Sequence, residues 1–242
     1  MSEQKLIVSL DLSDLGKIKN LVNQLKGIIE IFKVGAIPFT YFGTEIVRWL
    51  KDNDCRVMLD LKYHDIPNTV ARACEGAMEL GVDMLTIHTS GGFSMLEEAV
   101  KATLVTADIK KIDRPRLLGV TVLTSIDEAY FKDLFGDIKR SLEEQVVFFA
   151  QLARSAGLDG VVASPNEIEA IRKACGDELL IVTPGIRVQE EVIEADDQAR
   201  VTTPRAAFEA GANFIVIGRP IVRAKDPVAA AEKILKEIDE GN

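Results

Sequence analysis

The chain has 242 residues, which allows one large domain or two small ones, and its 47% hydrophobic and 28% charged content is typical of a soluble globular protein. Its formal net charge of −9 argues against a general affinity for nucleic acid or for anionic membranes, so a phosphate ligand would need a local cluster of cations. No apolar stretch approaches the roughly 18 residues of a membrane-spanning helix, and we therefore expect no membrane partner.

Short β-rich runs alternate with helical patterns along the whole chain. Runs of β-branched apolar residues predict strands at 6–11, 29–34, 56–62, 83–88, 117–123, 159–163, 179–183 and 213–217. A 3.6-residue spacing predicts helices at 14–26, 38–51, 67–80, 94–106, 139–156, 166–175, 203–210 and 226–239, with Gly27, Gly81, Gly157 and Gly211 as stops. Because no linker-like or low-complexity segment interrupts this alternation, we expect a single domain over residues 1–242.

Eight strand–helix units of about 30 residues each favour an α/β fold, a single closed (β/α)8 TIM barrel. In such a barrel the active site lies at the carboxyl ends of the strands. The residues expected at those ends are polar or compatible with phosphate: Asp11, Lys33, Asp60 with Lys62, His88, Thr124 with Ser125, Ser164, Arg187, and Gly218 with Arg219. An open doubly wound sheet is the alternative fold, although no G-x-G-x-x-G follows an early strand to mark a dinucleotide site.

The segment Asp60-Leu-Lys-Tyr-His-Asp-Ile-Pro-Asn-Thr69 places two carboxylates and one ammonium within six positions, directly after an apolar run. Alternate residues of a strand share a face, so Asp60 and Lys62 are expected to point the same way, about 6 to 7 Å apart. The structural alternative is a strand-end ion pair, with Asp65 capping the helix that Pro67 opens.

Together, Lys33, Asp60, Lys62 and Asp65 would form an array of alternating charge at the mouth of the barrel. An ammonium beside carboxylates keeps its proton, so Lys62 is expected to act as a general acid and not as a nucleophile. A substrate carboxylate held beside Asp60 would be repelled until it left as carbon dioxide. This pattern suggests decarboxylation, with Lys62 protonating the new carbanion.

Metal binding is not expected. His64 and His88 belong to no H-x-x-x-H or Cys/His set, which argues against zinc, and we interpret both as structural. Magnesium is harder to exclude, but Lys33 and Lys62 would crowd a cation out of the Asp60 site.

The last two units resemble the phosphate grip of such barrels, in which the loops after strands seven and eight bind phosphate. These loops supply Pro184-Gly-Ile-Arg187 and Gly218-Arg219, where glycine permits close backbone approach and arginine offers a fork for phosphate oxygens. The long polar stretch 188–202 between them is interpreted as a closing lid.

The N-terminus and the cysteines predict a cytoplasmic protein. The short apolar run Leu6 to Leu10 ends at Asp11, before the core of a signal peptide could form. Cys55, Cys74 and Cys175 are scattered and odd in number, which is typical of reduced thiols in a cytosol.

The chain resembles the orotidine 5′-phosphate decarboxylase family in its bacterial form, over essentially its whole length. The most specific segment is D-L-K-Y-H-D-I-P-N-T at 60–69. It is supported by L-D at 10–11, F-K-V-G at 32–35, L-T-S at 123–125, T-P-G-I-R at 183–187, D-D-Q-A-R-V at 196–201 and I-G-R-P at 217–220. The resemblance implies decarboxylation of orotidine 5′-monophosphate to uridine 5′-monophosphate, the last step of de novo pyrimidine synthesis, without cofactor or metal.

The resemblance also implies roles for single residues. Lys62 resembles the proton donor and Asp60 the carboxylate beside the leaving group, while Lys33 and Asp11 resemble the partners of the ribose hydroxyls. The family's homodimer implies that Asp65, Ile66 and Thr69 serve the neighbouring subunit's site. Thr124 and Ser125 resemble the turn that recognises the pyrimidine, and the phosphate set is implied to be Arg187, Gln198, Gly218 and Arg219, with Pro184 beside it. The lid between Arg187 and Gln198 is slightly longer and more acidic than the family pattern.

Two other functions stay open. A magnesium-dependent keto-gulonate-phosphate decarboxylase or hexulose-phosphate synthase shares the barrel and a D-x-K-x-x-D core, but those enzymes end the second strand with an acidic ligand where this chain has Lys33. A non-catalytic barrel that binds a phosphorylated nucleotide predicts loss of the acid or its neighbour, yet Asp60, Lys62 and Asp65 are all present.

Overall fold

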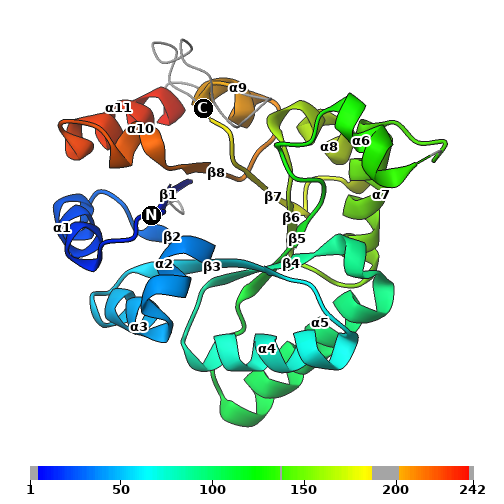
Figure 1. Cartoon of the computed structure of the whole chain (residues 1–242), viewed down its shortest axis with the longest axis horizontal. Helices are drawn as coiled ribbons and strands as arrows, with labels where there is room; N and C mark the ends of the chain where they lie inside the picture. The colour runs from blue at the N-terminus through cyan, green and yellow to red at the C-terminus, as the bar shows by residue number, and fades with distance from the viewer. Residues whose placement is uncertain (1–4, 137, 187–201, 240–242) are drawn as a thin grey trace.

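The computed structural model describes residues 5–136, 138–186 and 202–239 and shows a closed parallel barrel (Figure 1). Each strand pairs in parallel with the next, and β1 pairs with β8 to close the ring. The strands are β1 (Leu6–Ser9), β2 (Ile31–Gly35), β3 (Arg56–Tyr63), β4 (Met84–His88), β5 (Arg116–Val120), β6 (Gly160–Val162), β7 (Leu180–Thr183) and β8 (Phe214–Ile217). The predicted (β/α)8 barrel is confirmed, and the open sheet is wrong.

Helices surround the strands on the outside of the ring (Figure 1). They are α1 (Leu15–Leu25), α2 (Ala36–Phe42), α3 (Thr44–Asp52), α4 (Pro67–Glu79), α5 (Phe93–Lys110), α6 (Glu128–Phe135), α7 (Leu142–Ser155), α8 (Ile168–Cys175), α9 (Pro204–Glu209), α10 (Arg219–Val222) and α11 (Pro227–Asp239), with short 3-10 turns η1 (Thr89–Gly91) and η2 (Pro165–Glu167). None of the helices in the described part of the chain is long and apolar enough to cross a membrane.

The alternation of side chains along each strand divides the core into two parts. Residues facing the helices form one large buried cluster. Residues facing the barrel axis form a smaller one, consisting of Ile7, Ile31, Met58, Met84, Leu118, Val182, Phe214 and Val216. This inner cluster fills the barrel below the strand ends, so the site above it rests on a packed floor.

The predicted helix at 38–51 is wrong, because the chain forms two helices there. Gly43 separates α2 from α3 with a φ of 58°, a left-handed conformation that interrupts the helix and that glycine adopts without steric cost. The sequence analysis also missed α6 and α10. The four glycines predicted as helix stops are confirmed, each lying just beyond a helix with positive φ.

One hydrogen bond recurs at the amino-terminal end of the barrel, in alternate units of the described chain. An Asp or Asn two residues after a helix-ending glycine accepts from a backbone N–H of the preceding strand. The pairs are Asp83 with Val57 at 2.7 Å, Asp159 with Leu117 at 2.7 Å, and Asn213 with Ile181 at 2.8 Å. Each side chain also accepts from a cation, respectively Lys51, Arg114 and Arg172. We call these three arrangements the strand clasps.

Candidate active site

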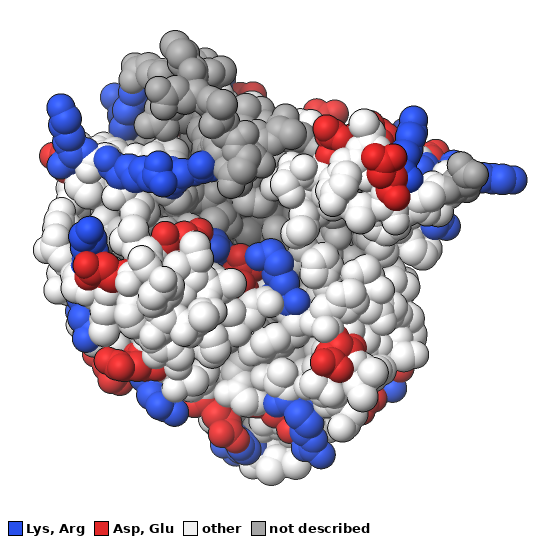
Figure 2. Space-filling model, viewed as in Figure 1, with Lys and Arg blue, Asp and Glu red and all other residues white. Residues whose placement is uncertain are grey.

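A cavity of about 510 Å³ opens at the carboxyl ends of the strands. It is lined by Ser9, Asp11, Leu12, Lys33, Ile37, Met58, Asp60, Lys62, Val120, Val122, Leu123, Thr124, Val162, Ala163, Pro184, Gly185, Val216, Gly218, Arg219, Val222 and Arg223. On this face of the molecule acidic and basic side chains gather in the central hollow (Figure 2). The cavity lies at the end of the barrel where the strand-end rule places an active site.

The cavity has one charged wall and one apolar wall. On β1 to β4 the inward-facing residues change from apolar to polar two positions further along each strand: Ile7 to Ser9, Ile31 to Lys33, Met58 to Asp60 and Met84 to Thr86. On the other side the lining contains four valines: Val120 on β5, Val122 just beyond it, Val162 on β6 and Val216 on β8. The site can thus hold a ligand that is charged on one side and apolar on the other.

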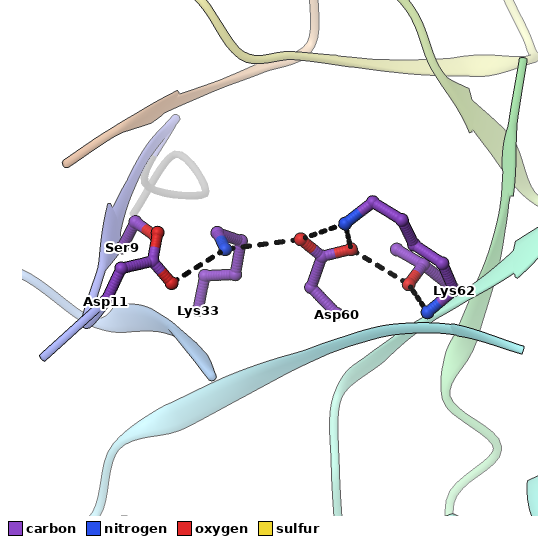
Figure 3. Close-up of polar contacts among 6 residues, drawn as sticks. Ser9, Asp11, Lys33, Asp60 and Lys62 are labelled. Carbon is purple, nitrogen blue, oxygen red and sulfur yellow. Dashed lines mark hydrogen bonds and ion pairs between the residues drawn. The ribbon is translucent and has the colours of Figure 1, made fainter. Parts of the chain in front are cut away.

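The charged wall is a continuous chain of ion pairs (Figure 3). Lys33 Nζ lies 3.4 Å from Asp11 Oδ1 and 3.2 Å from Asp60 Oδ2. Lys62 Nζ donates to both Asp60 oxygens at 2.9 Å. Of the predicted array of Lys33, Asp60, Lys62 and Asp65, the first three are present with Asp60 at their centre, and the second carboxylate is Asp11. Asp65 is exposed and does not join the array.

The backbone of β3 is not the regular strand that the sequence analysis assumed. Leu59 lies opposite Leu85 while Tyr63 lies opposite Ile87, so four steps along β3 match two along β4. Within this irregular stretch Lys62 has a φ of 51°, in the left-handed region. The regular alternation expected over Asp60 and Lys62 is therefore interrupted. The two side chains nevertheless point into the same cavity, where their charged groups meet.

Two hydroxyls that the sequence analysis missed support the array. Ser9 Oγ donates to Asp11 Oδ2 at 2.6 Å, and Thr86 Oγ1 donates to Asp60 Oδ1 at 3.0 Å. Both residues are buried. The sequence held part of the information needed to find them, because Ser9 and Thr86 each follow an inward-facing apolar residue by two positions. Gly35 contributes differently: a Cβ there would lie 2.9 Å from both Asp11 Oδ1 and Lys33 Nζ.

The electrostatics of the wall keep Asp60 ionised. Burial by itself would raise the pKa of Asp60, but the ammoniums of Lys33 and Lys62 and hydrogen bonds from Lys62 and Thr86 outweigh it. The pKa is therefore held below its ordinary value of 3.8. The site thus presents a permanent negative charge between two cations.

The two histidines lie close together at the edge of this wall. The His64 and His88 rings have centroids 5.4 Å apart, and His88 Nδ1 is 3.3 Å from Ser90 Oγ. Burial lowers the pKa of His88, and His64 and Lys62 lower it further, while Asp60 acts in the opposite direction. Among the described residues no group of three or more His, Cys, Asp or Glu side chains is arranged to hold a metal ion.

The rim beyond β7 and β8 carries the residues predicted to bind phosphate. Pro184, Gly185, Gly218 and Arg219 line the cavity together, and Arg223, which the sequence analysis did not identify, joins them from the end of α10. Arg187 and Gln198, and nearly all of the predicted lid at 188–202, lie outside the described residues.

Most of the remaining predicted residues do not line the cavity. Thr124 lines it but Ser125 does not, and Ser125 is exposed. Asp65, Ile66 and Thr69 are exposed as well. Asp65 accepts from the Ile66 N–H at 2.7 Å, and the N-cap of α4 is Ile66, without a side-chain hydrogen bond. The alternative role of Asp65 as a helix cap is therefore wrong.

Comparison with known proteins places this geometry in context. A family model described as "Orotidine 5'-phosphate decarboxylase / HUMPS family" matches residues 4–234. The chain is 49% identical over 238 residues to a protein of Moorella thermoacetica named orotidine 5′-phosphate decarboxylase, covering 98% of this chain and 93% of that protein. A Syntrophus aciditrophicus protein of the same name is 46% identical over 241 residues, covering 99% and 95%.

Two solved structures have the same fold over nearly the whole chain. The crystal structure of orotidine 5′-phosphate decarboxylase from Lactobacillus acidophilus has a TM-score of 0.84 and 34% identity, covering 98% of this chain and 100% of that one. An uncharacterized conserved protein from Geobacillus kaustophilus has a TM-score of 0.83 and 36% identity, covering 96% and 99%.

Proposed function

Because this chain belongs to the orotidine 5′-phosphate decarboxylase / HUMPS family, we propose that it is the carboxy-lyase that converts orotidine 5′-monophosphate to uridine 5′-monophosphate and carbon dioxide. The observation that carries the proposal is the array of Asp11, Lys33, Asp60 and Lys62 on one wall of a cavity that Arg219 and Arg223 also line. This activity is the last step of de novo pyrimidine synthesis, and we place it in the cytoplasm.

The two walls suggest how the substrate is oriented. The 5′-phosphate is bound at Gly218 and Arg219 beside Pro184, and Arg187 and Gln198 complete this set in the proposal. The ribose hydroxyls meet Asp11 and Lys33. The pyrimidine lies along the valines of the apolar wall, and Thr124 and Ser125 recognise its edge. The carboxylate is then directed towards Asp60.

The reaction breaks one bond and forms one. The C6–carboxylate bond breaks, carbon dioxide leaves, and the electron pair stays on C6. Lys62 Nζ, 2.9 Å from Asp60, gives a proton to C6 and regains one from solvent. Asp60 stays ionised throughout and holds Lys62 in place, so the fixed charges of the wall supply the stabilisation of the carbanion.

No metal is needed in this scheme. A cation at Asp60 would have to displace the ammoniums of Lys33 and Lys62, both of which already contact this carboxylate. The same argument disfavours the magnesium-dependent family members, since Lys33 stands on β2 where those enzymes are expected to carry an acidic ligand. The array is also fully assembled, which disfavours a barrel that only binds nucleotides.

We further propose that the active unit is a homodimer. Asp65, Ile66 and Thr69 are exposed in the single chain and absent from its cavity, although they directly follow the array in the sequence. Asp65 and Ile66 lie side by side on the surface, and Ile66 is 66% exposed although it is large and apolar. Delivery of these residues to the neighbouring subunit's site accounts for this exposure.

The decisive experiment follows carbon dioxide release from orotidine 5′-monophosphate by the pure protein, with and without a chelator. We expect equal turnover under both conditions. Absence of turnover contradicts the assignment. Turnover that a chelator abolishes and magnesium restores contradicts the metal-free scheme. A parallel assay with magnesium and a hexulose or keto-gulonate phosphate should show no reaction.

A further inference from the structure

Thr86 occupies a position at which one hydroxyl connects two groups of the charged wall. It lies on β4, is fully buried, and faces the barrel axis two residues after Met84. Its Oγ1 donates to Asp60 Oδ1 at 3.0 Å and accepts from the Lys62 backbone N–H at 2.9 Å. Because an N–H can only donate, the hydroxyl proton must be directed to the carboxylate, and the hydroxyl has one orientation.

The hydrogen bond to Lys62 replaces a missing contact of the sheet. The register between β3 and β4 shifts between Leu59 and Tyr63, and within that stretch the Lys62 N–H donates to the Thr86 side chain. Lys62 has a φ of 51°, a conformation disfavoured for a residue with a Cβ, so it persists only where surrounding contacts hold it. The Thr86 hydroxyl is such a contact.

The backbone of Lys62 decides where its ammonium lies. With this left-handed turn, the side chain folds back so that Nζ reaches both oxygens of Asp60, two residues earlier. The same threonine holds one of those oxygens. A single buried hydroxyl therefore sets the position of the carboxylate and the base of the lysine side chain relative to each other.

We propose that Thr86 is a positioning residue for the reaction, which fixes the Asp60 carboxylate and the Lys62 backbone in one geometry through the two hydrogen bonds of its hydroxyl. It is fully buried and is not among the residues that line the cavity, so it acts through Asp60 and Lys62. The inference rests on the proposed function for its kinetic consequence, but not for its geometry.

The test compares Thr86→Val, which removes the hydroxyl, with Thr86→Ser, which keeps it. We expect Thr86→Val to lower kcat by about 10- to 100-fold with little change in KM, since an error of about 1 Å in a reacting group has this effect. Thr86→Ser should recover most of the loss. Thr86→Ala, which adds no second methyl beside the carboxylate, replaces Thr86→Val if the latter does not fold.

The pH profile separates positioning from simple loss of packing. The charged or titratable groups facing Asp60 are Lys33 on β2, Lys62 on β3 and His88 at the end of β4, with Asp11 behind Lys33. Loss of the Thr86 hydrogen bond raises the pKa of Asp60, so the acid limb of the kcat profile should move to higher pH in Thr86→Val and not in Thr86→Ser.

Thr103→Val is the matched control, because Thr103 is equally buried and its hydroxyl donates to Val100 O on α5, away from the cavity. It should leave kcat and the pH profile unchanged. Wild-type kinetics in Thr86→Val, or equal losses in the Val and Ser variants, would overturn the proposal.

A crystal structure of Thr86→Val tests the geometry without any turnover. We expect Lys62 to leave the left-handed region or the Asp60 carboxylate to rotate; if both keep their wild-type positions, the proposal is wrong. If the wild type itself releases no carbon dioxide, the proposed function fails, and this structural result still decides the role of Thr86.

Discussion

Asp60 shows how the balance of single interactions sets the chemistry of the site. The carboxylate is buried, a situation that normally favours its neutral form, yet two ammoniums and the Thr86 hydroxyl hold its pKa below 3.8. Ionised Asp60 therefore stabilises the folded state fully above the ordinary pKa of the carboxyl group. This contribution is lost as the pH falls through the lower pKa that the group has in the folded protein. Near neutral pH the negative charge at this position is constant.

Lys62 is the residue on which the proposed reaction depends most. Lys62→Ala should lower kcat by at least about 100-fold, because general acids contribute roughly 10²- to 10⁴-fold, while binding of uridine 5′-monophosphate stays measurable by calorimetry. Lys101→Ala, which removes an exposed lysine paired with Glu97 on α5, should retain full activity. A Lys62→Ala variant with wild-type turnover would remove Lys62 from the mechanism.

The strand clasps stabilise the fold by joining neighbouring strands of the barrel. Asp83, Asp159 and Asn213 each satisfy a backbone N–H at the start of the preceding strand, and each is in contact with a cation. They join strand pairs at the end of the barrel opposite the cavity. Stability and chemistry are therefore carried by opposite ends of the same strands.

Asp159→Ala should lower the free energy of unfolding by about 1–3 kcal/mol, because it leaves the Leu117 N–H and the Arg114 guanidinium without this partner. The kcat should not change. Asp159→Asn is the control, because Asn213 already fills the equivalent place in the last clasp. It should lower the free energy of unfolding by less than Asp159→Ala does. Denaturant unfolding measures both, and equal costs for Ala and Asn would contradict the role of the side-chain oxygen.

At the scale of the whole molecule, the proposed dimer predicts complementation between two inactive variants. Lys62→Ala lacks the acid of its own site, whereas Asp65→Ala lacks the group delivered to the neighbouring site. A hybrid dimer then contains one complete site. Unfolding and refolding an equal mixture should restore about a quarter of the wild-type activity, since half of the dimers are hybrids and half of their sites are intact.

The control for this experiment refolds each variant alone, which should stay inactive. If the mixture gains no activity, Asp65 serves the site of its own chain or none. Size-exclusion chromatography with light scattering checks that both variants keep the assembly state of the wild type.

The barrel and the polar strand ends could be predicted from the amino-acid sequence, because the alternation of strands and helices and the residues that follow each strand are local patterns. Asp11, Lys33, Asp60 and Lys62 meet since the carboxyl ends of parallel strands converge on one mouth. The register shift of β3, the left-handed backbone of Lys62 and the two hydrogen bonds of Thr86 could not be predicted in this way. These depend on how two strands far apart in the sequence are aligned, and no local pattern encodes that alignment.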